Sequence, residues 1–110
     1  MSTINTAHRN EYALITGATS GIGYELARLF AKDGYNLVLV ARNGDRLQEV
    51  TDMLKTDYGV EVTPLVKDLF QLNAAGEIYN TTRQMGVNIN VLVNDAGQGE
   101  WGSFLETDLE

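Results

Sequence analysis

The 110-residue sequence contains no cysteine and only one histidine. Without cysteine there can be no disulfide bonds, thiolate nucleophiles or cysteine-based metal sites. The single histidine, His8, lies in a polar leader, so we expect neither a histidine-based catalytic dyad nor a metal centre. A chain without cysteine is compatible with a reducing compartment, and we expect a cytoplasmic protein.

Long hydrophobic runs and a surplus of basic residues are also missing. No apolar run approaches the roughly 18 residues that a membrane helix requires, so no membrane span is expected. Residues 1–10 lack the apolar middle of a secretory signal, and we expect a flexible leader followed by one domain over residues 11–110. Lysine and arginine number 8 against 15 acidic residues, for a net charge of -7. This charge repels phosphate backbones, and nucleic acid is therefore not an expected partner.

Short apolar runs alternate with segments of helical periodicity along the chain. Asn43 is a suitable N-cap for the second helical segment, and Gly34, Gly59 and Gly86 stand where the three helices should end. The predicted strands are residues 12–16, 36–41, 60–66 and 89–93, and the predicted helices are residues 21–33, 44–58 and 73–86. The predicted inward faces are Ile22, Leu26, Leu29 and Phe30 in the first helix, Leu47, Val50, Leu54 and Tyr58 in the second, and Ala75, Ile78, Tyr79, Thr82 and Met85 in the third.

This strand–helix alternation predicts an α/β fold, a Rossmann-like doubly wound parallel sheet with helices on both faces. The complete fold has six strands in the order 3-2-1-4-5-6, so the four strands here should adopt the order 3-2-1-4. The only proline, Pro64, lies in the third strand and favours an edge position, because proline cannot donate to a neighbouring strand. The fourth strand would have an uncovered apolar edge, which, with Trp101 and Phe104, predicts a homo-oligomer.

Residues 16–23 (TGATSGIG) form a glycine-rich turn between the first strand and the first helix. Gly17 can make the sharp turn, Gly21 can let a pyrophosphate approach the backbone, and Gly23 can let the helix pack closely on the sheet. The helix N-terminus would add N–H donors and a favourable dipole. No Gly-Lys-Ser/Thr follows, which excludes a P-loop, whereas a purely structural turn remains the alternative. The candidate cofactor-binding residues here are Gly17, Thr19, Ser20, Gly21, Ile22 and Gly23.

The spacing T-G-x-x-x-G-x-G resembles that of the short-chain dehydrogenase/reductase family. Two further motifs follow in the family's order, Lys67-Asp68-Leu69 after the third strand and Asn94-Asp95-Ala96-Gly97 after the fourth. The resemblance covers residues 12 to about 108, and it implies that Asp68, with Leu69 beside it, contacts the adenine ring. It also implies that Asn94, Ala96 and Gly97 steady the sheet and line the cofactor site. Asp95 stands where the family has a second Asn and adds a negative charge there.

The end of the second strand bears on the choice of cofactor. NAD-binding domains carry an acid there for the ribose 2′-OH, but this chain has Arg42 followed by Asn43. The planar guanidinium suits a 2′-phosphate, and in the resembled family Ala-Arg-Asn accompanies NADP preference. We therefore expect NADP rather than NAD, and the hydroxyl of Ser20 could add a weaker contact to the 2′-phosphate. The alternative is that Arg42 is a surface charge paired with Asp45.

The resemblance implies a catalytic Asn, a Ser and a Tyr-x-x-x-Lys pair in segments beyond residue 110. None of the five tyrosines is followed four residues later by lysine, so we assign no catalytic residue and expect the 110-residue chain to be inactive. The intact protein would reduce a carbonyl or oxidise an alcohol, with its substrate left open. The alternatives are a non-catalytic dinucleotide-binding or self-associating module, and an α/β methyltransferase. The missing acid after the second strand counts against the methyltransferase.

Overall fold

The computed structural model describes residues 10–19, 21–68 and 73–94. All the predicted elements are present, although the third strand begins at Val62 rather than at residue 60. The strands are β1 (Tyr12–Thr16), β2 (Asn36–Ala41), β3 (Val62–Val66) and β4 (Ile89–Asn94), and the helices are α1 (Gly21–Lys32), α2 (Gly44–Tyr58) and α3 (Ala74–Met85).

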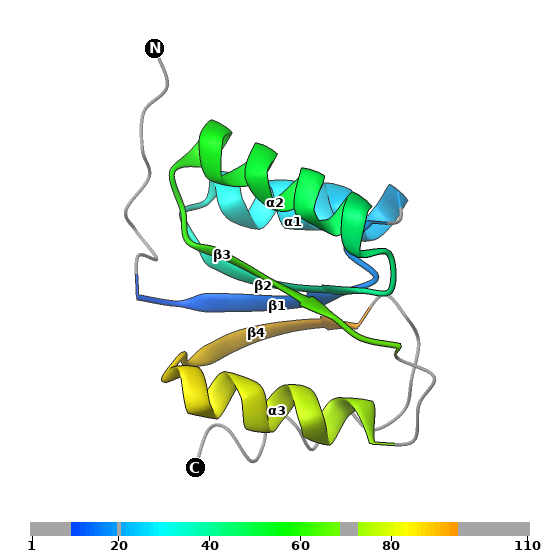
Figure 1. Ribbon diagram of the computed structural model, residues 1–110. Coiled ribbons are helices and arrows are strands. Elements are labelled where there is room, and N and C mark those ends of the chain that lie inside the picture. The colour runs from blue at the N-terminus through cyan, green and yellow to red at the C-terminus, as the bar shows by residue number, and fades with distance from the viewer. Residues whose placement is uncertain (1–9, 20, 69–72, 95–110) are drawn as a thin grey trace.

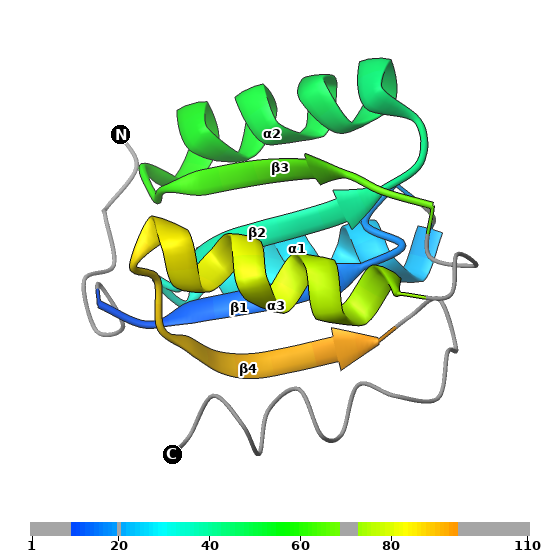
Figure 2. The same cartoon turned by 60° about the horizontal axis from the view of Figure 1, so that its bottom comes forward.

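The strands form one parallel sheet in the order β3-β2-β1-β4, which confirms the predicted topology. All four strand arrows point to the same end of the sheet (Figure 2). Pro64 pairs with Leu39 of β2 on the inner side of β3, and β3 is an edge strand of the described sheet. The position of this proline was predictable because an edge strand has one side on which no N–H donor is needed.

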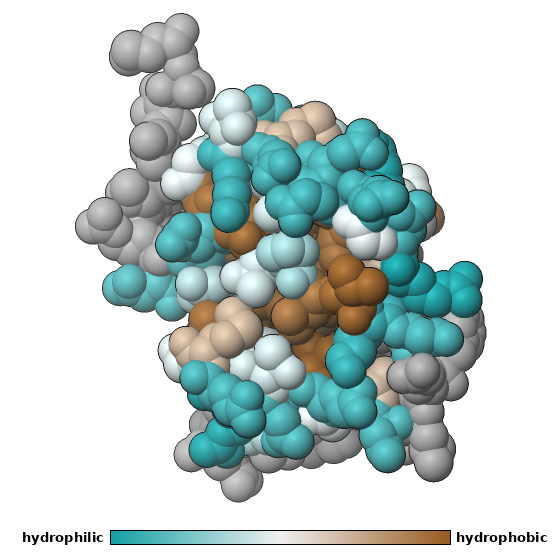
Figure 3. All heavy atoms as spheres, in the orientation of Figure 1, coloured by the Kyte–Doolittle hydropathy of each residue, from teal (hydrophilic) through white to brown (hydrophobic). Residues whose placement is uncertain are grey.

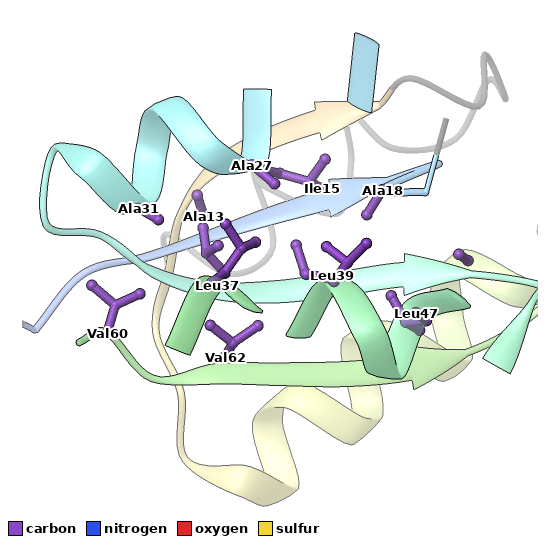
Figure 4. Close-up of a cluster of buried hydrophobic side chains, with 13 residues drawn as sticks. Ala13, Ile15, Ala18, Ala27, Ala31, Leu37, Leu39, Leu47, Val60 and Val62 are labelled. Atoms are coloured by element: carbon purple, nitrogen blue, oxygen red, sulfur yellow. The ribbon is translucent and has the colours of Figure 1, made fainter. Parts of the chain in front are cut away.

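Helices α1 and α2 cover one face of the sheet and α3 covers the other (Figure 1). The two faces bury separate clusters, because successive side chains of a strand point to opposite sides. Leu37 and Leu39 of β2 join the cluster under α1 and α2 (Figure 4), whereas Val38 and Val40 join the cluster under α3. Every residue of β2 is buried, as expected of a central strand covered on both faces.

The helix ends follow the predicted capping residues. The side chain of Asn43 accepts a hydrogen bond of 3.1 Å from the backbone N–H of Arg46, as an N-cap does. Gly34, Gly59 and Gly86 have φ values of 93°, 69° and 74° in the left-handed region. Each of these glycines therefore ends its helix in a conformation that other residues rarely adopt.

The predicted inward face of α1 is only partly right: Phe30 packs against the core cluster and Leu26 is half-buried, but the two other residues point outward. Ile22 and Leu29 are 68% and 47% exposed, and the helix buries the small residues Gly23, Ala27 and Ala31 instead. These three residues are spaced by four and form one stripe, which lets the helix backbone lie close to β1 and β2. Periodicity of large apolar residues is a poor guide where close packing selects small ones.

The predicted face of α2 is confirmed, with Leu47, Val50 and Leu54 buried. In α3, Ile78 and Thr82 are buried as predicted, but Met85 is 40% exposed. Met85 is the last residue of α3, where the chain turns away toward β4. Within the described residues, no helix has the length and apolar character needed to cross a membrane.

Candidate functional site

The candidate site lies where the four parallel strands end. Thr16, the last residue of β1, pairs with Val40 of β2 on one side and with Asn94 of β4 on the other. From β1 the sheet continues to β2 and β3 on one side, and the chain then crosses back to add β4 on the other side of β1. In open α/β sheets such a reversal of strand order leaves a crevice outside the carboxyl ends of the strands, where ligands bind.

The glycine-rich turn leaves β1 at this crevice. Gly17 has a φ of 66°, so the predicted sharp turn uses the left-handed conformation that glycine allows. The backbone N–H of the fully buried Ala18 donates to the carbonyl of Val40 over 3.2 Å, which fastens the turn to the end of β2. Among the described residues, a Cβ placed on Gly21 would meet no atom within 4 Å outside its chain neighbours and its own helix backbone. The backbone at Gly21 therefore faces open space, as an approaching pyrophosphate requires.

The N-terminus of α1 supplies the electrostatics of this crevice. The first turn of α1 carries no acidic side chain, so no carboxylate of that turn offsets the positive end of the helix dipole. Gly21 and Ile22 are exposed at this end, while Gly23 is buried against the sheet. Unpaired N–H groups at a helix start bind phosphate well. The residues therefore fit a dinucleotide, with the exposed Ile22 side chain offering an apolar surface beside the phosphate position.

A buried hydrogen bond joins the ends of β1 and β4. The hydroxyl of Thr16, which is fully buried, donates to Oδ1 of Asn94 over 2.9 Å. The carbonyl of Val93 lies 3.5 Å from the same hydroxyl. The bond orients the Asn94 amide at the edge of the crevice. Asn94 was predicted, but Thr16 was missed as its partner, although a hydroxyl at the end of an otherwise apolar buried strand is the available signal.

The ends of β2 and β3 bring the predicted adenosine residues to the same edge. Arg42 and Asp68 follow the two strands within two residues, and Arg42 is exposed while Asp68 is half-buried. The N–H of Lys67 donates to the carbonyl of Ala41 over 3.0 Å, which continues the ladder one residue past β3. Thus the segments carrying Arg42 and Asp68 are held side by side.

Part of the predicted site lies outside the described residues. Thr19 is half-buried within the described turn. The predicted residues outside the described part are Ser20, Leu69, Ala96 and Gly97, together with Asp95, Trp101 and Phe104.

In the described part of the chain, no cluster of three or more His, Cys, Asp or Glu side chains could hold a metal ion. Burial and then the neighbouring Glu61 raise the pKa of the Tyr12 phenol. Tyr12 begins β1 and so lies at the opposite, amino edge of the sheet. We therefore give it no part in the candidate site.

Figure 3 shows the surface beside this site in the orientation of Figure 1, with an apolar area over the edge strand β3. Val66, the last residue of β3, is 59% exposed. Its side chain comes within 3.4 Å of the position that a Cβ on Gly44 would take. Apolar surface therefore borders the crevice at the end of β3, two residues before Asp68.

Comparison with known proteins agrees with this geometry. The profile of a family described as short chain dehydrogenase matches residues 11–110. The chain is 39% identical over 89 residues to the very-long-chain 3-oxoacyl-CoA reductase of Rattus norvegicus, with 79% of this chain and 27% of the relative covered. It is 30% identical over 116 residues to an uncharacterized oxidoreductase of Staphylococcus aureus, with 96% and 49% covered. The chain thus spans between a quarter and a half of these curated relatives.

Solved structures give the same result. The L-sorbose reductase of Gluconobacter frateurii, complexed with NADPH and L-sorbose, matches with a TM-score of 0.76 and 36% identity, covering 88% of this chain and 37% of the other. A short-chain dehydrogenase from Sphingobium yanoikuyae in complex with NADPH matches with a TM-score of 0.71 and 34% identity, covering 90% and 42%. The fold, the glycine turn and these matches agree, and the chain belongs to the short-chain dehydrogenase family.

Proposed function

We propose that this chain is the NADP(H)-binding part of an oxidoreductase that interconverts a carbonyl compound and an alcohol. The observation that carries the proposal is the open backbone at Gly21, at the carboxyl end of the central parallel strand. The bound nicotinamide supplies the hydride, while the protein binds and orients it. The two solved relatives named above are complexes with NADPH, which supports this choice of cofactor.

The pyrophosphate binds at the start of α1, against the backbone of residues 17–23. The open side of Gly21 admits it, the N–H groups of the first helical turn donate to it, and Thr19 can add a hydroxyl in the same turn, whereas Ser20 can offer its hydroxyl to the 2′-phosphate. Gly17 and Gly23 act indirectly, one by making the turn and the other by allowing the helix to pack.

The two ends of the cofactor then lie toward opposite edges of the sheet. The guanidinium of Arg42 binds the 2′-phosphate, and Asp68 with Leu69 contacts the adenine, because these residues follow β2 and the edge strand β3, on the side of β1 away from β4. Asn94 ends β4, Ala96 and Gly97 come after it in the sequence, and the three residues border the nicotinamide ribose. The hydrogen bond from Thr16 supports this role of Asn94 by holding its amide in one orientation.

Arg42→Ala tests the cofactor preference. A bidentate charged contact contributes about 1.5–3 kcal/mol, so the variant should bind NADPH roughly 10- to 150-fold more weakly and bind NADH nearly as before. Fluorescence titration of the purified chain with each reduced cofactor measures both constants. Lys55→Ala, at the exposed far end of α2, is the matched control. Equal losses for both cofactors would contradict the role of Arg42, and a chain that binds neither cofactor would overturn the proposed function.

The activity of the whole protein rests on its relatives and on family chemistry. The named relatives include reductases of a 3-oxoacyl-CoA and of L-sorbose, which supports a carbonyl substrate for this protein. The 110 residues contain no Tyr-x-x-x-Lys, so the chain alone should not oxidise NADPH with any carbonyl compound. Absorbance at the reduced nicotinamide band, followed over a carbonyl panel, checks this expectation.

Self-association is a second property we propose for the chain as given. In the described sheet β4 pairs only with β1, and its residues after Ile89 are half-buried or exposed. An open strand edge of this kind can pair with a second copy. Sedimentation at tens of micromolar should show a dimer or larger species, and a stable monomer would contradict self-association.

The proposed domain begins near residue 11, where the family match starts. The cysteine-free sequence supports the cytoplasm as the location of the protein.

A further inference from the structure

The end of β3 and the start of α3 are joined by a side chain that the proposed cofactor site does not use. The Nζ of Lys67, directly after β3, forms an ion pair with Oε1 of Glu77 in the first turn of α3. The backbone N–H of the same lysine donates to the carbonyl of Ala41 over 3.0 Å. Lys67 therefore links the end of β2, the end of β3 and the start of α3.

Both ends of this link are themselves held in place. Ala41 is buried at the end of β2 and directly precedes Arg42. The N–H of Glu77 donates to the carbonyl of Asn73 over 2.9 Å, which places Glu77 in the regular first turn of α3. An acid in that turn also suits the helix dipole, so the carboxylate has a stable position from which to receive the lysine.

The ion pair lies beside a described candidate for the adenine contact. Asp68 is the immediate neighbour of Lys67, whose side chain and backbone N–H are both held. Fixing the residue next to Asp68 reduces the conformations that Asp68 can adopt. A ligand that needs Asp68 in one position then loses less ordering entropy on binding.

We propose that Lys67 is a positioning residue for the adenosine end of the cofactor and acts through its ion pair with Glu77. This inference rests on the proposed function, because it gives the pair a role only if Asp68 contacts adenine. The alternative role for Lys67 is direct contact with the 2′-phosphate, since Arg42 follows the neighbouring strand. The pairing with Glu77 favours the positioning role, because the lysine would have to leave that carboxylate to reach a phosphate.

The test is a double-mutant cycle on cofactor binding with Lys67→Met, Glu77→Gln and the double variant. The side chains of the pair are 32% and 51% exposed, so the effect is modest. Each single variant should bind both NADPH and NADH about threefold more weakly. The double variant should also lose about threefold rather than ninefold, because the second change removes nothing further once the pair is broken. Lys67→Arg, which can keep the pair, should retain wild-type affinity.

The remaining outcomes separate this inference from the proposed function. Lys55→Met controls for the loss of one positive charge, and urea unfolding of each variant reports damage to the fold. A loss confined to NADPH would make Lys67 a phosphate ligand and overturn the positioning role, and so would unchanged affinities or a ninefold loss in the double variant. If the wild-type chain binds NADPH and Asp68→Ala weakens both cofactors while Lys67→Met does not, only this inference fails. A wild-type chain that binds neither cofactor overturns the proposed function.

Discussion

Gly21→Ala should separate cofactor binding from folding. Within the described part of the chain, a methyl group at Gly21 would meet no neighbouring atom within 4 Å, and the φ of this residue is not in the left-handed region, so the fold can accept alanine without strain. Alanine in place of glycine inside a helix stabilises by about 0.5–1 kcal/mol, and less is expected at the first residue of α1. The free energy of unfolding should therefore stay the same or rise slightly.

The same methyl group would occupy the space that the pyrophosphate needs. Inserting a methyl group into a closely packed contact costs about 1–3 kcal/mol. NADPH should therefore bind roughly 5- to 150-fold more weakly to the alanine variant. NADH should lose as much, because the two cofactors share the pyrophosphate. This common loss distinguishes the turn from Arg42, whose removal should affect NADPH selectively.

Gly76→Ala is the matched control for this experiment. Gly76 lies near the start of α3, and a Cβ there also meets no atom of residues 10–19, 21–68 or 73–94 within 4 Å outside its own helix. The control should be as stable as Gly21→Ala or more so, and it should keep wild-type affinity for both cofactors. Fluorescence titration measures binding and urea unfolding measures stability. Unchanged NADPH affinity in a folded Gly21→Ala chain would show that phosphate does not approach this backbone, and the reasoning about the turn would be wrong.

Two further predictions concern polar groups in the core. Thr16→Val should destabilise the fold by about 1–2 kcal/mol, because it removes the buried hydrogen bond to Asn94. Asn94→Ala should then add little further loss in the Thr16→Val background, and Thr63→Val on the edge strand is the control. If urea unfolding shows that the losses from the two changes add fully, the pairing of Thr16 with Asn94 is contradicted. Thr51→Val should stabilise by about 1 kcal/mol, because the buried Thr51 hydroxyl has no hydrogen-bond partner within the described residues, and a lower urea midpoint would show that this hydroxyl is satisfied in solution.

Features that depend on neighbours in the chain were predictable from the sequence. Alternating apolar runs and helical segments predicted the element order, and the rules for parallel sheets turned that order into the topology 3-2-1-4. Asn43 and Gly59 predicted the two ends of α2, because capping involves residues only three or four positions apart. Gly17 and Pro64 were informative through their own backbones, because glycine permits a positive φ and proline has no N–H to donate.

Features that depend on contacts between distant segments came only from the tertiary structure. The packing of α1 through Gly23, Ala27 and Ala31 depends on how closely that helix approaches the sheet, which the periodicity of large apolar residues does not report. The bond between Thr16 and Asn94 joins residues 78 positions apart and requires the register of β1 with β4. A hydrophobic pattern is set by near neighbours in the chain, whereas partners for buried polar groups are decided by how the strands and helices come together in space.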